Sequence, residues 1–105
     1  MKLNKLFTQG LKTIQEIDMR YEDYIRQLAA HKGYDLAALH EWERNLIKQT
    51  CFKAIAQIDT MTEFLYDMTK NNVSSKRQYQ FVYDKQKDIR ASYVRLTNEF
   101  NRLGL

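Results

Sequence analysis

Three segments of this chain carry apolar side chains at alternating spacings of three and four residues. That spacing places the apolar side chains along one side of an α-helix, because a helix turns about once every 3.6 residues. The segments predict helices over residues 3–30, 35–71 and 75–103. The 105 residues include no proline and only three glycines, which also favours an all-helical chain.

Two short breaks separate the predicted helices. The first contains Gly33, which suits the left-handed backbone that ends many helices, and Asp35 can cap the start of the next helix. The second break covers residues 71–75, and Ser75 with Gln78 fits a capping box for the third helix. Because both breaks are short, neighbouring helices are expected to run antiparallel.

The predicted fold is therefore an all-α, antiparallel three-helix bundle of long helices with coiled-coil-like seams, in a single domain over residues 1–105. Gly10 and Gln86 occupy weak positions in the first and third apolar seams, and Gly10 is expected to let the first turns of its helix fray or bend. The remaining seam residues form the predicted core. It includes Ile14, Ile17, Tyr21, Leu28, Ile47, Cys51, Ile58, Leu65, Val82, Ile89, Leu96 and Leu103.

The middle segment has an irregular apolar face. From Ile47 onward the apolar residues share one side of the predicted helix, whereas Leu39, Trp42 and Leu46 lie on another. One interpretation is a local register shift near residues 46–50, where the helix is either continuous or broken. The other is that the earlier apolar face meets a second chain. A helix of about 36 residues would be about 54 Å long and would project beyond its neighbours.

The sequence offers little for catalysis. His31 and His40 lack the further ligands that a metal site needs, and the only cysteine, Cys51, lies on an apolar seam. No glycine-rich phosphate loop or carboxylate–histidine motif occurs. We therefore expect no enzymatic activity, no metal and no cofactor.

The cysteine count and the lack of membrane signals bear on where the protein is found. A single cysteine fits a reducing cytoplasm, which is the expected location. No apolar run approaches the roughly 20 residues of a membrane span, and no lipidation motif is present. Leu6, Phe7 and Leu11 are better explained as part of the first bundle helix than as a lipid-binding surface, so a membrane partner is not expected.

Aromatic residues are numerous, with seven Tyr, five Phe and one Trp. Several lie off the predicted seams, where a wide core or an interface could take them, and aromatic side chains supply much of the binding energy at interfaces. The main hypothesis is a non-enzymatic protein–protein interaction module or accessory subunit that binds itself or a larger partner. The candidate interface residues are Leu39, Trp42, Leu46, Phe52 and Phe64.

The charge distribution gives a second hypothesis. The net charge is +4, and residues 72–105 hold seven basic and three acidic side chains. Basic side chains beside aromatic rings can contact phosphates while bases stack, although an ordinary solvated helix face has the same composition. The alternative function is therefore a nucleic-acid-binding accessory protein that uses its basic third helix. The candidate residues are Lys76, Arg77, Lys87, Arg95 and Arg102.

Overall fold

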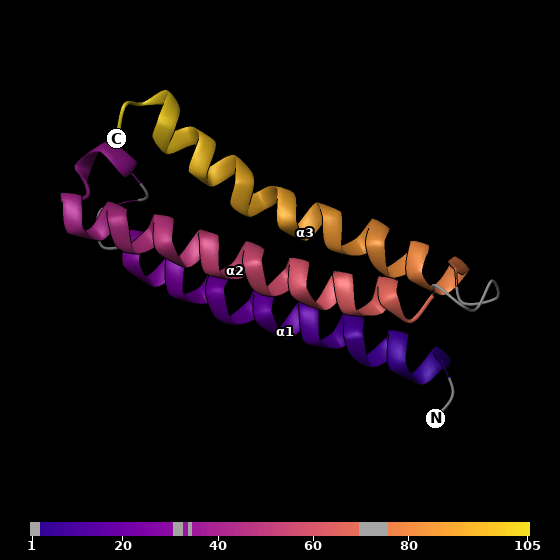
Figure 1. Ribbon diagram of the computed structural model, residues 1–105. Helices are drawn as coiled ribbons and strands as arrows, with labels where there is room; N and C mark the ends of the chain where they lie inside the picture. The colour runs from indigo at the N-terminus through magenta and orange to yellow at the C-terminus, as the bar shows by residue number, and fades with distance from the viewer. Residues whose placement is uncertain (1–2, 31–32, 34, 70–75) are drawn as a thin grey trace.

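A computed structural model describes residues 3–30, 33, 35–69 and 76–105 of the chain. Three long helices pack along one another, and the middle one runs opposite to the other two (Figure 1). Their bounds are Leu3–Ala30 for α1, Glu41–Asp67 for α2 and Lys76–Arg102 for α3, and a short 3-10 helix, η1, covers Leu36–Ala38. The protein is thus an antiparallel three-helix bundle, as the apolar spacing predicts.

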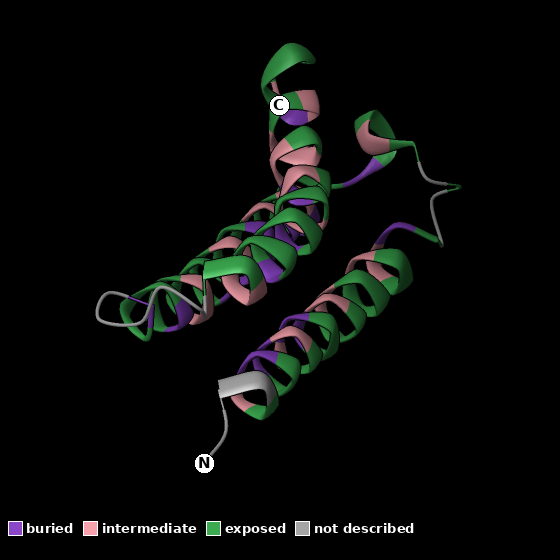
Figure 2. Ribbon diagram, turned by 90° about the vertical axis from the view of Figure 1, so that its right-hand side faces the viewer, coloured by how far each residue is buried: buried purple, intermediate pink, exposed green. Residues whose placement is uncertain are grey.

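The core lies between the three helices, whose inward sides are buried and whose outer sides are exposed (Figure 2). Most predicted core residues contribute to it. Ile14, Ile17, Ile47, Cys51, Ile58, Leu65 and Val82 are buried, together with Phe7, Tyr93 and Phe100 from the same seams. Tyr21, Leu28, Ile89 and Leu96 are partly buried against them. Each fully buried aliphatic or aromatic side chain contributes about 1.5–3 kcal/mol to folding.

Leu103 is the predicted core residue that the structure places at the surface, with 41% of its area exposed. The reason is the way α3 ends. Gly104 adopts φ 72°, a left-handed conformation that glycine tolerates without strain, and the Leu105 N–H donates to the Phe100 carbonyl at 2.9 Å. This turn brings Leu105 against the core in place of Leu103.

The predicted middle helix over 35–71 is wrong at its start. The Asp35 carboxylate accepts a hydrogen bond from the Ala37 N–H at 3.1 Å and so caps η1, not α2. The backbone is extended at Leu39 and His40, and α2 begins at Glu41. A side chain of its own first turn caps α2: the backbone N–H of His40 donates to the Glu43 carboxylate at 2.9 Å.

This break explains one residue of the irregular apolar face. Leu39 precedes α2, so its position cannot be extrapolated along that helix, whereas α2 itself is unbroken through residues 46–50. Trp42 and Leu46 lie within α2, where Trp42 is exposed and Leu46 is half-buried away from the core line. α2 has 27 residues and is no longer than α1 with 28, so the predicted projecting helix of about 54 Å does not form.

Gly33 and Gly10 have separate structural roles. Gly33 has φ 65° and its N–H donates to the Ala30 carbonyl, which confirms the predicted left-handed cap after α1. α1 runs unbroken through Gly10. This glycine is buried where α1 meets α2, and a Cβ added there would lie 2.7 Å from Cδ1 of Leu65. The predictions for His31 and for the Ser75 capping box lie outside the described residues.

Candidate functional site

The solvent-facing side of α2 carries an uncharged stripe. Its two large side chains, Trp42 and Phe52, are 63% and 60% exposed. Asn45, Gln49 and Ala56 are exposed as well and complete spacings of three, four, three and four along the helix. This spacing aligns all five side chains on one side of α2. We call these five residues the α2 stripe.

The α2 stripe shares two features with protein interfaces, namely the absence of charge and the presence of exposed aromatic side chains. Protein interfaces are depleted in charge at their centre and enriched in aromatic residues, and one or two aromatic anchors supply most of the binding energy. The stripe is about 21 Å long, at 1.5 Å per residue. Lys53 is exposed beside the stripe, and Asp59 and Glu63 continue its spacing beyond Ala56, so the uncharged part ends there.

The structure does not bring all the predicted interface residues together. Leu39 is only 3% exposed and belongs to the core, because the extended backbone before α2 turns it inward, so its assignment to the surface is wrong. Leu46 is half-buried in a hollow between α1 and α2, and Phe64 lines a different hollow beside Ile17. Of the predicted set, Trp42 and Phe52 alone share the stripe.

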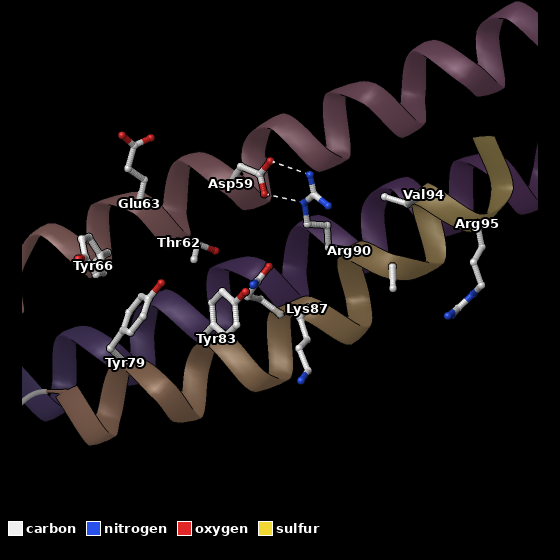
Figure 3. A pocket seen from close by; sticks show the side chains of 12 residues that line it. Asp59, Thr62, Glu63, Tyr66, Tyr79, Tyr83, Lys87, Arg90, Val94 and Arg95 are labelled. Carbon is white, nitrogen blue, oxygen red and sulfur yellow. Dashed lines mark hydrogen bonds and ion pairs between the residues drawn. The ribbon is translucent and has the colours of Figure 1, made fainter. Parts of the chain in front are cut away.

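A groove of about 580 Å³ lies between α2 and α3 (Figure 3). Tyrosines line one half of it. The ring of Tyr79 meets that of Tyr66 edge-on, with centroids 5.4 Å apart, and that of Tyr83 at a tilt, with centroids 5.9 Å apart. Burial, and then the nearby Tyr83 and Tyr66, raise the pKa of Tyr79 above its ordinary value, so this phenol carries no charge at neutral pH.

Charged side chains of opposite sign lie on the two edges of the groove. The Arg90 guanidinium crosses from α3 and donates to the Asp59 carboxylate on α2, at 2.8 Å from Nε and 3.3 Å from Nη2. Lys87 and Arg95 lie on the α3 edge, whereas Glu63 lies on the α2 edge close to Tyr66 (Figure 3). Since Arg90 neutralises Asp59, the α3 edge is positive and the α2 edge is negative.

One wall residue of the groove has an unmet hydrogen-bonding group. Gln86 lines the groove and is only 3% exposed. Among the described residues, no donor reaches its buried Oε1. A buried acceptor without a partner lowers the free energy of unfolding by about 1–3 kcal/mol. An apolar side chain at this position would avoid that loss.

The structure gathers only part of the predicted nucleic-acid set. Lys87 and Arg95 share the groove edge. Lys76 and Arg77 are exposed in the first turn of α3, and Arg77 lines a separate hollow. Arg102 forms an ion pair with Glu99 near the other end of the helix, and this contact lowers the pKa of Glu99.

Sequence reasoning missed the tyrosines, Arg90 and Gln86 as members of one site. A signal for part of it exists in the sequence, because Tyr79, Tyr83 and Lys87 are spaced four residues apart and so share one side of α3. The contributions of Tyr66 and Asp59 depend on how α2 is aligned with α3, which local spacing does not reveal.

The cysteine and the possible metal ligands of the described residues are arranged as follows. Burial raises the pKa of the Cys51 thiol to about 11, so it stays protonated and unreactive at neutral pH. No three side chains of His, Cys, Asp or Glu cluster as metal ligands within the described ranges. No described helix is long and apolar enough to cross a bilayer.

Comparisons with known proteins give no match of any of three kinds: no family model fits the chain, no curated protein is similar in sequence, and no solved structure is similar to it.

Proposed function

We propose that this protein is a non-enzymatic interaction module that binds a second copy of itself through the α2 stripe. One observation carries the proposal: Trp42 and Phe52 are 63% and 60% exposed on a side of α2 where Asn45, Gln49 and Ala56 add no charge. Exposed aromatic residues in an uncharged strip of regular spacing are typical of a helix that packs against another helix.

The α2 stripe is complementary to itself. If two α2 helices meet antiparallel with a two-fold axis at Gln49, the large Trp42 faces the small Ala56 of the second copy. Asn45 then lies opposite Lys53 and next to Phe52, and the two Gln49 amides exchange hydrogen bonds. Large side chains opposite small ones let two helix faces interdigitate. A helix of a larger partner with the same arrangement is the heteromeric form of this hypothesis.

Sedimentation velocity over a micromolar to millimolar concentration range tests the proposal. We expect the wild type to shift from monomer to dimer as concentration rises, and Trp42→Ala combined with Phe52→Ala to remain monomeric. Both side chains are exposed, so these substitutions should change the free energy of unfolding by no more than about 0.5 kcal/mol each, which circular dichroism during thermal unfolding will check.

Met19→Ala is the matched control, because Met19 is 67% exposed but lies on α1. This variant should dimerise like the wild type. A wild type that stays monomeric at every concentration, or a double variant that dimerises normally, would show that the stripe is not a self-association surface.

A second candidate function, a nucleic-acid-binding accessory protein, is favoured by one specific observation. Lys87 and Arg95 lie on the edge of the same groove that three tyrosines line. Cations beside stacking platforms are the combination that single-stranded nucleic acids bind.

A further inference from the structure

We infer that the groove between α2 and α3 binds a segment of single-stranded nucleic acid, with its bases on the tyrosines and its phosphates along the α3 edge. The inference rests on the second candidate function and narrows it. In place of the whole basic face of α3, it assigns the contact to one groove shared by two helices.

The tyrosine half of the groove provides stacking surfaces. Tyr66 and Tyr83 are 51% and 39% exposed, so part of each ring is open to a ligand. Tyr79 lies between them in ring contact with both, which holds the three rings as one unit. Unpaired bases stack on such rings whatever their sequence. A duplex hides its base faces and cannot use this half.

The charges on the two edges of the groove decide which edge the phosphates of the strand occupy. Lys87 and Arg95 line the α3 edge, whereas Glu63 lies on the α2 edge and repels phosphate. Arg90 is held by Asp59 at the centre of the groove. A strand therefore meets attraction along α3 and repulsion along α2, which places its backbone on the α3 edge and leaves its bases to face the tyrosines.

Fluorescence anisotropy of labelled 12-nucleotide oligo(dC), a length of about the usual site size, tests the inference at low and at physiological salt. Tyr83→Ala should weaken binding about 5- to 150-fold, the range for loss of one stacking contact. Tyr83→Phe retains the ring and should bind like the wild type. An abasic oligonucleotide of equal length should bind far more weakly than oligo(dC), because it offers phosphates without bases.

The matched charge variants separate this groove from α3 as a whole. Lys87→Gln with Arg95→Gln should reduce the slope of log affinity against log salt by about 1.4, at roughly 0.7 per phosphate contact on a single strand. Lys76→Gln with Arg102→Gln removes the same formal charge from the same helix outside the groove and should leave that slope unchanged.

Each outcome decides the matter. If both charge pairs weaken binding equally and Tyr83→Ala does nothing, nucleic-acid binding stands but the groove is not its site. If the wild type binds no oligonucleotide even at low salt, the second candidate function fails together with this inference. Displacement by polyglutamate as effective as by oligo(dC) would identify an acidic protein as the ligand instead.

Discussion

Gln86 occupies a position where the spacing of its neighbours calls for an apolar side chain. It follows Val82 and precedes Tyr93 on the buried side of α3, and all three are at most 3% exposed. Packing alone does not explain a polar group there, because its Oε1 loses water without gaining a donor from the described residues. This oxygen is closed to solvent, and so to a ligand in the groove as well, which leaves a cost in stability that the described contacts do not offset.

Replacing Gln86 by methionine tests that account through stability. Gln86→Met keeps the length of the side chain and removes the unpaired acceptor, so the free energy of unfolding should rise by about 1 kcal/mol. Urea denaturation followed by circular dichroism measures it. Gln15→Met is the control, because Gln15 is exposed on α1 and its replacement should change stability by no more than about 0.5 kcal/mol. A loss of stability in Gln86→Met would mean that the amide is well satisfied in the folded protein.

At the scale of the helix, Gly10 shows how closely α1 approaches α2. A Cβ at this position would lie 2.7 Å from Cδ1, 3.0 Å from Cδ2 and 3.2 Å from Cγ of Leu65. Leu65 is fully buried, so it has little room to move aside. The glycine therefore leaves room for the Leu65 side chain against α1, at the cost of about 1 kcal/mol of helix propensity relative to alanine.

Gly10→Ala accordingly has two opposing effects. It gains about 1 kcal/mol of helix propensity and loses about 1–3 kcal/mol through overpacking against Leu65. We expect a net destabilisation of up to about 2 kcal/mol, measured by chemical denaturation.

A double-mutant cycle separates the two effects. In a Leu65→Ala background the crowding is gone, and Gly10→Ala should become stabilising by about 1 kcal/mol. If alanine at position 10 destabilised both backgrounds equally, contact with Leu65 could not be the reason for the glycine.

Helices and their buried sides could be predicted from sequence because the spacing of apolar residues records them directly. Element ends could be predicted only where a local signal marks them. Gly33 signalled the end of α1, whereas nothing before Glu41 distinguished the break at Leu39 and His40 from a continuous helix. Leu105 displaced Leu103 from the core through a glycine turn whose direction depends on the adjacent helices. The groove combines residues of α2 and α3, so it required the alignment of the two helices.

At the scale of the whole molecule, hydrogen bonds between side chains fix that alignment. Gln57 of α2 donates to the Tyr21 hydroxyl of α1 at 2.7 Å. The Tyr93 hydroxyl of α3 donates to the Asp18 carboxylate of α1 at 2.7 Å. Arg90 and Asp59 join the remaining pair of helices. These hydrogen bonds would be lost if one helix slid along another by one turn. Apolar seams alone tolerate such a shift more easily.

A buried thiol, Cys51, and a buried phenol, Tyr93, make the stability of the bundle sensitive to high pH. Burial raises the pKa of Cys51 from 9.0 to about 11, and burial, followed by the hydrogen bond to Asp18, raises the pKa of Tyr93 above its ordinary value. Both groups stay protonated in the folded protein after the unfolded chain has begun to ionise. The contribution of these two groups to stability should therefore be constant well below pH 9 and fall as the pH rises from 9 through 11.

Thermal unfolding at several pH values on either side of that window measures the effect. Cys51→Ala and Tyr93→Phe remove the two acids one at a time, and each variant should lose part of the alkaline decline even though its stability at neutral pH is lower. A decline of the same steepness in the wild type and in both variants would assign the alkaline sensitivity to other groups, such as the lysines.

Trp42 has one more consequence, which is spectroscopic. It is the only tryptophan of the chain and is exposed to solvent on the α2 stripe, with 63% of its area accessible. Its indole emission therefore reports the occupancy of that surface and little else in the molecule. A partner that covers the stripe should shift the emission to shorter wavelength and shield it from iodide quenching, whereas an oligonucleotide in the groove should leave both unchanged, so a single unlabelled sample distinguishes the two binding events.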